Sequence, residues 1–110
     1  MRIKAIHILL PLGFYVGGCF TPDPKSLNSD NPSSAVPAIK QAADKNDRSA
    51  IPRLIADLED NDSTIRFAAI SALQQMTGQT YDYHYYADVS ERKPAVAQWH
   101  KWLAEHPNGK

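Results

Sequence analysis

The stretch AIPRLIADLEDNDSTIRFAAISALQQMTG, residues 50–78, holds two apolar patterns of helical period on either side of the short polar turn DND. In each pattern apolar residues recur three or four positions apart, which predicts one helix over residues 48–59 and another over residues 63–76. Two helices joined by so short a turn form an antiparallel αα-hairpin. The expected inward residues are Ile51, Leu54, Ile55 and Leu58 in the first helix, and Ile65, Ala68, Ala69, Ala72, Leu73 and Met76 in the second.

Residues of the preferred capping types stand at the ends of these two helices. Asp47 and Asp62 can each accept a hydrogen bond from a backbone amide of the turn that follows. Gly78 can end the second helix, because glycine adopts the left-handed conformation without steric cost. The sequence therefore predicts where the hairpin begins, turns and ends.

A further helix is expected before the hairpin, over residues 34–44. Ser33 or Ser34 is its expected N-cap, and Pro37 falls in its first turn, where a missing amide hydrogen is tolerated. The polar residues KND then interrupt the pattern. The expected apolar face of this helix consists of Val36, Ile39, Ala42 and Ala43.

A last helix follows the hairpin and ends near Glu105. Asp88 with Glu91, or Ser90 alone, can cap it. Pro94 is acceptable only near the start of a helix, so the boundary is expected at Ser90 or later. The residues that share its apolar face are Val96, Trp99, Trp102 and Leu103.

The hairpin sequence resembles one HEAT repeat, a family that has a proline early in its first helix, an aspartate at the turn and an arginine early in its second helix. Pro52, Asp60 and Arg66 stand at these positions, eight and then six residues apart. The resemblance implies an all-α fold: a short α-solenoid with one HEAT-like helical hairpin and a capping helix on each side. In HEAT proteins the aspartate and the arginine pair and order the turns; the alternative is an exposed pair that contributes little.

The amino terminus has the parts of a bacterial export signal. Arg2 and Lys4 precede an apolar run of about the length of a secretory core, which is too short to span a bilayer. The end of the run, Val16-Gly17-Gly18-Cys19, resembles the lipobox of bacterial lipoproteins. That resemblance implies that the thiol of Cys19 is diacylglycerylated, that the chain is cut before Cys19 and that the new amine is usually acylated. Acyl chains such as palmitate would then hold the protein at a membrane. The alternatives are an ordinary signal peptide and an apolar helix with an incidental cysteine.

The chain is therefore expected to have three parts: a lipoprotein signal peptide (1–18), a flexible linker (19–33) rich in proline and polar residues, and a HEAT-repeat helical domain (34–110). Phe20 stands after the cysteine, where an aspartate would oppose outer-membrane sorting in Gram-negative bacteria. The resemblance thus implies a protein outside the cytoplasm, with the outer membrane favoured.

Composition and motifs argue against several classes of function. Lys plus Arg and Asp plus Glu are equal at 12 each, which gives no net field to attract nucleic acid. No phosphate-binding loop, nucleophile elbow or set of serine, histidine and acid is present, so we expect no enzyme and no cofactor. Asp57, Glu59, Asp60 and Asp62 are expected to be solvated or to cap helices.

The segment YDYHYY, residues 81–86, is an unusual cluster. Asp82 and His84, with His100 or His106, are candidates for a metal site, although their spacing is not that of helical zinc ligands, so no metal is expected. Otherwise the tyrosines form a platform for a carbohydrate or peptide, or pack over the end of the hairpin with their hydroxyls in water. The candidate partner surface consists of Tyr83, His84, Tyr85, Trp99 and Trp102.

HEAT repeats usually serve as scaffolds, so the resemblance implies a lipid-anchored module that binds an unidentified protein of the bacterial cell envelope. An alternative is an accessory protein that handles a ligand or metal, because repeats similar to HEAT also occur in bilin lyases. One hairpin leaves apolar surface on both sides and needs neighbours to cover it. The first helix and the aromatic tail are expected to be those neighbours.

Overall fold

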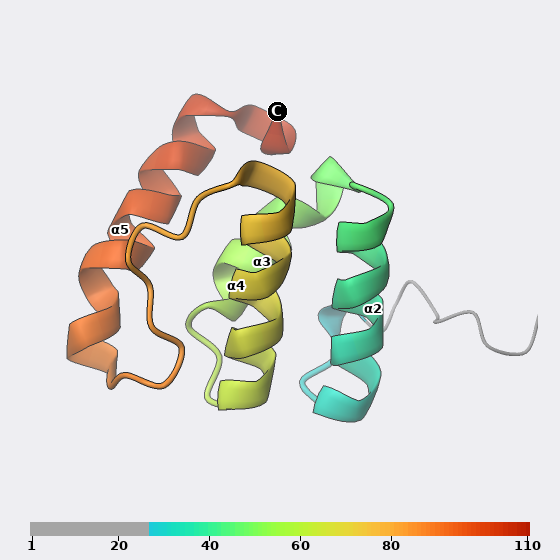
Figure 1. Cartoon of the computed structure of the whole chain (residues 1–110), viewed down its shortest axis with the longest axis horizontal. Helices are drawn as coiled ribbons and strands as arrows, with labels where there is room; N and C mark the ends of the chain where they lie inside the picture. Colours follow the sequence, from blue (N-terminus) through green and yellow to red (C-terminus); the bar gives the residue numbers. More distant parts are fainter. Residues whose placement is uncertain (1–26) are drawn as a thin grey trace, which may run out of the picture.

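The computed structural model describes residues 27–110, and these residues form an all-helical fold without a strand (Figure 1). The predicted all-α class is therefore confirmed, whereas the short α-solenoid stays a prediction. The expected signal peptide and Cys19 lie outside the described residues. The α-helices are α2 (Pro32–Asp44), α3 (Ile51–Asp57), α4 (Ser63–Thr77) and α5 (Val89–Glu105), with short 3-10 turns at Arg48–Ala50 and Pro107–Gly109.

Helix α2 begins earlier than the sequence predicts. Its N-cap is Asn31, whose side-chain oxygen accepts a hydrogen bond from the Ser33 amide at 3.0 Å. The prediction of Ser33 or Ser34 as the cap was wrong, because Pro32 at the first helical position presets the backbone and carries no amide hydrogen to satisfy. The cap and the proline together start the helix two residues before Ser34.

Two prolines lie inside helices, at the sixth position of α2 (Pro37) and of α5 (Pro94). The expectation that Pro94 requires a helix start at Ser90 or later was wrong, since α5 begins at Val89. Each proline removes one amide that would bond to the carbonyl four residues earlier, at Ser33 or Ser90. Both of these serines are exposed, so water can serve the carbonyl that is left.

The other predicted caps are confirmed, but the helix expected over residues 48–59 is a 3-10 turn followed by α3, which ends at Asp57. Asp47, Asp62 and Asp88 each accept a hydrogen bond from a backbone amide in the turn that follows. Gly78 ends α4 with a φ of 80°, and its amide donates to the Gln74 carbonyl. The bonds from Glu91 and Ser90 hold the pKa of the Asp88 carboxyl below its usual value, which favours the charged cap.

Helix α4 packs against α2 on one side and α3 on the other, and α5 packs against α3 (Figure 1). Both helices bury alanines, which are Ala35, Ala38, Ala42 and Ala43 in α2 and Ala69 and Ala72 in α4. The large buried side chains belong to one core cluster. The fully buried large residues are Ile39, Ile51, Leu54, Ile55, Leu58, Ile65, Leu73 and Trp99.

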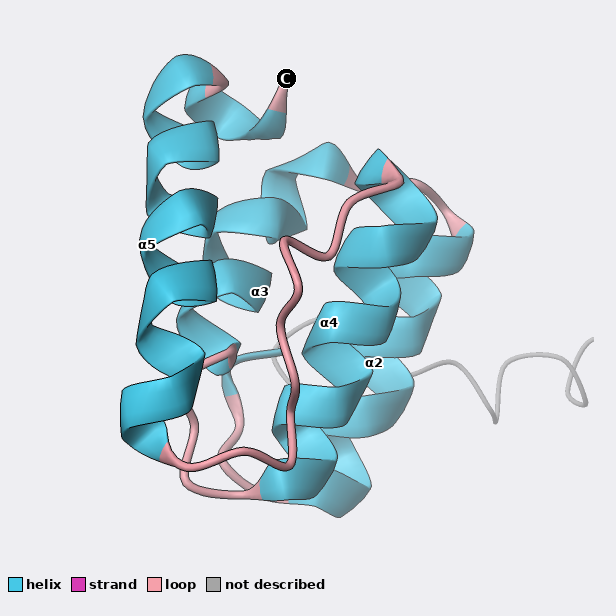
Figure 2. Cartoon of the chain, turned by 60° about the vertical axis from the view of Figure 1, so that its left-hand side comes forward, coloured by secondary structure: helices cyan, strands magenta, loops and turns pink. Residues whose placement is uncertain are grey.

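The loop between α4 and α5, residues 78–88, runs lengthwise between these two helices (Figure 2). Tyr81 and Asp82 take left-handed φ angles of 54° and 58°, which are uncommon for residues other than glycine. The Tyr81 ring packs edge-on against Trp99 of α5, with ring centroids 4.9 Å apart. This turn in the backbone directs the next side chain, Tyr83, into the core.

The last turn of the chain is attached through Arg48. Its Nε donates to the Gly109 carbonyl at 2.8 Å, and its Nη1 donates to the Met76 carbonyl at 2.9 Å. Gly109 has a φ of 76°, and a Cβ atom there would collide with the Arg48 carbonyl oxygen. One arginine therefore joins the end of α4 to the residues that follow α5.

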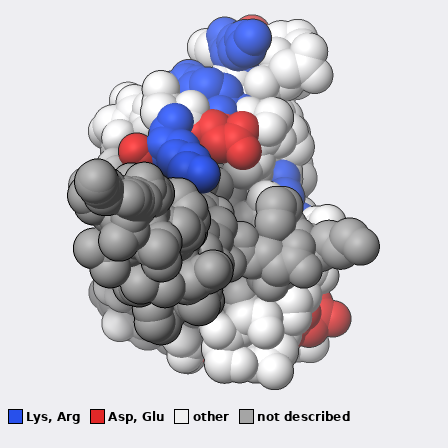
Figure 3. Space-filling view, turned by 90° about the vertical axis from the view of Figure 1, so that its right-hand side faces the viewer, with Lys and Arg blue, Asp and Glu red and all other residues white. Residues whose placement is uncertain are grey.

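Charges of both signs are mixed on the surface. Figure 3 shows lysine or arginine side chains next to aspartate or glutamate side chains toward the upper end of one face. This mixture agrees with the balanced composition of the chain. Among residues 27–110, the structure contains no helix of the length and apolarity that a bilayer crossing requires.

Replacing Ala69 by leucine should destabilise the fold, because Ala69 is completely buried where α4 meets its neighbours. Three added carbon atoms would overpack this contact at a cost of about 1–3 kcal/mol. Thermal unfolding should then show a melting temperature lower by roughly 4–20 °C. Ser71→Leu, at an exposed position of the same helix, is the control; equal shifts in the two variants would contradict this packing.

Candidate functional site

Side chains from later parts of the chain donate hydrogen bonds to a backbone carbonyl at the end of α3. The Leu58 carbonyl accepts one hydrogen bond from the Tyr83 hydroxyl at 2.6 Å and another from Arg92 Nη1 at 3.2 Å. Carbonyls at a helix C-terminus have no partner within the helix and carry the negative end of its dipole. A cation and a hydroxyl are therefore well suited to bind there.

Arg66 makes a similar connection one turn away. Its Nη1 donates to the Asp60 carbonyl at 2.7 Å, and its Nε donates to the Tyr85 carbonyl at 2.9 Å. Arg66 and Asp60 are thus linked, but through a backbone oxygen, while the Asp60 carboxylate accepts from the Asp62 amide at 2.8 Å. Arg66 is only 9% exposed, so the alternative of an exposed pair was wrong.

Arg92 also donates from Nε to the Ala87 carbonyl at 2.9 Å. Arg66 and Arg92 together, which we term the arginine clamp, join the turn after α3 to residues 85–87 of the loop. Neither guanidinium lies within ion-pair distance of a carboxylate in the part of the chain that the structure describes. Hydrogen bonds from charged groups contribute about 1.5–3 kcal/mol each, so the clamp fixes the loop firmly.

The loop that the clamp holds presents aromatic side chains to solvent. Tyr85 contacts Phe67 of α4 with ring centroids 4.9 Å apart, and it contacts Tyr86 at 5.3 Å. His84 lies against Tyr86 at 5.4 Å. Phe67 is 51% exposed and Tyr86 is 70% exposed. We term these four residues, Phe67, His84, Tyr85 and Tyr86, the aromatic patch.

Hydrogen bonds fix the orientation of two side chains in the aromatic patch. His84 Nε2 lies 3.2 Å from Asp82 Oδ1, and His84 Nδ1 lies 3.2 Å from the Tyr86 hydroxyl. When Nε2 carries the proton and donates to Asp82, Nδ1 accepts the hydroxyl hydrogen of Tyr86. All three side chains are at least half exposed, so water competes with these bonds, and the arrangement suits binding better than proton transfer.

The other predicted partner residues are largely inside the molecule. Tyr83 is 6% exposed, its hydroxyl bonded to Leu58, and burial raises its pKa. Trp99 is completely buried, whereas Trp102 is half-buried and its ring stacks on His106 at 4.1 Å. Of the predicted surface, His84 and Tyr85 belong to the aromatic patch. The hydroxyl of Tyr83 is not in water, contrary to the packing alternative.

The three histidines considered for a metal site lie against different groups. His84 contacts Asp82 and Tyr86, His100 contacts Glu59, and His106 bonds to the Trp102 carbonyl. Within residues 27–110, no group of three or more side chains of the metal-binding types comes together. The structure therefore does not bring Asp82, His84, His100 and His106 into one site.

Phe67 and Arg92 are central to this surface, but sequence reasoning missed them. Phe67 could have been found, because a large aromatic residue stands two positions after Ile65 and therefore off the apolar face of α4. The sequence contains no signal for the role of Arg92, because its side chain bonds to backbone carbonyls 5 and 34 residues away.

Asp57 is buried, so the expectation that the acids around the turn are solvated was wrong for this residue. Its side chain is 3% exposed, and burial raises its pKa to about 6 even though Arg53 opposes the shift. Arg53 Nε is 3.0 Å from Asp57 Oδ1 but lacks hydrogen-bond alignment, and Oδ2 has no hydrogen bond. The charged carboxylate is therefore poorly compensated.

Comparisons of the chain with models of protein families, with curated proteins and with solved structures found no match. The aromatic patch and the clamp behind it therefore have to be interpreted from their own geometry.

Asp57→Asn should flatten the dependence of stability on pH between about 4 and 6. Because the folded state raises the pKa of Asp57, it binds more protons than the unfolded state in this range. The contribution of Asp57 to the free energy of unfolding is therefore greatest below pH 4. It falls by up to about 3 kcal/mol as the pH rises to about 6.

Urea unfolding of the two proteins at several pH values measures this effect. At pH 7 the variant should be at least as stable as the natural chain. Glu105→Gln, at an exposed helix end, should keep the original pH profile. Identical profiles for Asp57→Asn and the natural chain would contradict an ionised, poorly compensated Asp57.

Proposed function

We propose that this protein is a module for protein–protein interaction, or a scaffold, which a lipid on Cys19 anchors to a membrane of the bacterial cell envelope. The observation that carries the proposal is the aromatic patch. Exposed aromatic groups that adjoin one another are characteristic of protein interfaces, because they supply apolar area at little cost in side-chain entropy. In this chain a buried clamp orders the backbone beneath them.

We also propose that the helical hairpin is HEAT-like and forms a short α-solenoid with its flanking helices. Support comes from the packing of α3 on α4, in which Ile65, Ala69 and Leu73 are buried. The link between Arg66 and Asp60 orders the turn, as the resemblance implies, although a carbonyl accepts the bond. The contacts of α2 with α4 and of α5 with α3 suit the capping role.

The membrane anchor rests on the likeness of Val16-Gly17-Gly18-Cys19 to a lipobox. In such a protein the residues between Cys19 and α2 serve as a tether, so that the helices stand just beyond the lipid surface. The outer membrane is the favoured location, and the partner is a protein of the envelope. With balanced charge and no catalytic motif, neither a nucleic-acid partner nor an enzymatic activity is part of the proposal.

Photo-crosslinking in living cells tests the proposal. A photoreactive phenylalanine analogue replaces Phe67, which is half exposed in the aromatic patch. Illumination should give one dominant crosslinked protein in the membrane fraction, because the partner covers this ring. The same analogue at Lys40, an exposed position on α2, is the matched control and should give little crosslinking.

Two further variants separate the two parts of the proposal. Tyr86→Ser should reduce crosslinking at Phe67 at least fivefold, since it removes about 1 kcal/mol or more of contact energy. Cys19→Ser should remove the acyl mass from the mature chain and shift the protein out of the membrane fraction. Equal crosslinking at Phe67 and Lys40 would reject the patch, and an unmodified Cys19 in the natural chain would reject the anchor.

A further inference from the structure

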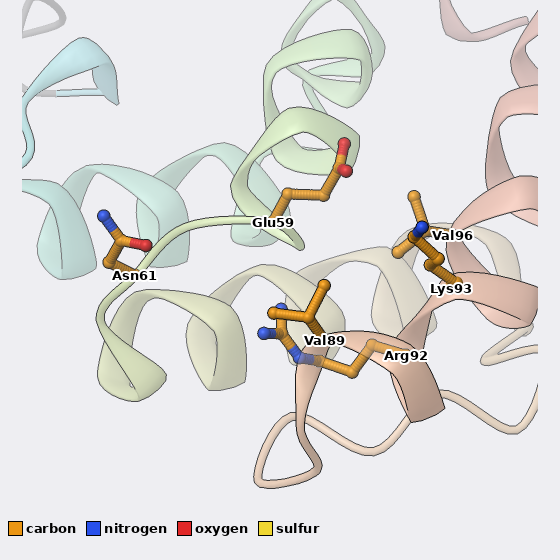
Figure 4. Close-up of a pocket in the computed structure, with 6 residues that line it drawn as sticks. All are labelled: Glu59, Asn61, Val89, Arg92, Lys93 and Val96. Atoms are coloured by element: carbon orange, nitrogen blue, oxygen red, sulfur yellow. The ribbon is translucent and has the colours of Figure 1, made fainter.

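A shallow hollow lies between the turn after α3 and the first half of α5 (Figure 4). It has a volume of about 130 Å³. Val89 and Val96 supply its apolar surface, and Val89 is 63% exposed. The polar groups around it are those of Glu59, Asn61, Arg92 and Lys93.

Among residues 27–110, the positive charges at the hollow form no ion pair. Arg92 is 8% exposed, and its two hydrogen bonds go to the carbonyls of Ala87 and Leu58. Lys93 forms no ion pair within the described residues. The Asp88 carboxylate acts on Arg92 only from beyond ion-pair distance, so a negative charge placed next to this guanidinium would stabilise it further.

Glu59 does not supply that negative charge. Its carboxylate contacts His100 at 3.6 Å, which lies further along α5 than the residues of the hollow. In Figure 4 the carboxylate points away from the guanidinium of Arg92. The side chains around the hollow therefore carry two positive charges and one negative charge, and neither positive charge is in an ion pair among residues 27–110.

We propose that this hollow binds the carboxylate of an aspartate or glutamate side chain in a segment of a partner protein, with an aliphatic neighbour of that residue resting on Val89 and Val96. The inference rests on the proposed function, because it gives the chemistry of the partner at a second contact. Arg92 and Lys93 attract the carboxylate, and the valines supply the apolar contact that a free inorganic anion cannot use.

The hollow and the aromatic patch are close along the chain, since Val89 follows Tyr86 by three residues. The arginine clamp connects them, because Arg92 bonds to the Ala87 carbonyl and Arg66 bonds to the Tyr85 carbonyl. One partner segment can therefore place aromatic or aliphatic residues on the patch and an acidic residue in the hollow.

A titration followed by NMR tests the inference with defined probes. The isotope-labelled full chain is mixed with the blocked tripeptide acetyl-Leu-Glu-Leu-amide or with its glutamine counterpart. The glutamate peptide should shift the amide signals of Val89, Lys93 and Val96, whereas the glutamine peptide should shift them at least fivefold less at equal concentration. Equal shifts with the two peptides, or none with the glutamate peptide at millimolar concentration, would overturn the inference.

Charge variants on α5 provide the matched control. Lys93→Glu should weaken binding of the glutamate peptide about fivefold or more, because it reverses a charge at the hollow. Lys101→Glu makes the same change at an exposed position outside the hollow and should leave binding within about twofold. Equal losses in both variants would show a general charge effect and would reject the site.

Two further comparisons distinguish the possible outcomes. Inorganic phosphate at the same concentration should cause smaller shifts than the glutamate peptide; equal or larger shifts would overturn the assignment to a carboxylate side chain. In the natural chain, peptide binding without crosslinking at Phe67 would reject the patch, whereas crosslinking at Phe67 without peptide binding would reject the hollow.

Discussion

The positions of α5 and of the loop between α4 and α5 depend on hydrogen bonds to the backbone at the end of α3 and in the turn after it. The last carbonyls of α3 lie where three segments meet, and they need donors that the helix itself cannot supply. Arg92 reaches the Leu58 carbonyl from α5, and Arg66 reaches the Asp60 carbonyl in the following turn from α4. Both arginines also bond to the backbone of the loop between α4 and α5. Tyr83 adds a third donor from the loop itself. This arrangement positions α5 and the loop on the hairpin, and among residues 27–110 no carboxylate lies within ion-pair distance of either arginine.

The same constraint explains the surface that the molecule presents. Where the clamp holds the backbone of residues 85–87, Tyr85 contacts Phe67 of α4 and Tyr86 contacts Tyr85. The hollow beside them has positive charge because the groups that bind Arg92 are carbonyls rather than an acid. An aromatic surface next to a hollow with free positive charge is the basis for proposing a partner with an acidic and apolar segment. The proposed lipid anchor would keep such a partner within reach at the membrane.

Much of the helical framework could be predicted from the sequence, because local rules determine it. The caps at Asp47, Asp62, Asp88 and Gly78 depend on residues only a few positions away. The start of α2 was missed because Pro32 and Asn31 compete with the serines for the cap.

The site was predicted only in part. Tyr85 and His84 stood out in an aromatic cluster, but the burial of Tyr83 and Asp57 depends on packing between distant segments. The bonds of Arg92 to backbone carbonyls leave no pattern in the side chains of the sequence.

Hydrogen exchange of the loop amides in an Arg66→Lys variant tests the role of the clamp most directly. Lysine keeps the positive charge but cannot donate to the Asp60 and Tyr85 carbonyls in the forked geometry of a guanidinium. The amides of Tyr83 and Ala87, which bond within the loop, should exchange about 5- to 100-fold faster, while those in the middle of α2 should change little. Unchanged exchange in the loop, or an equal increase in α2, would contradict a clamp that specifically holds the aromatic surface.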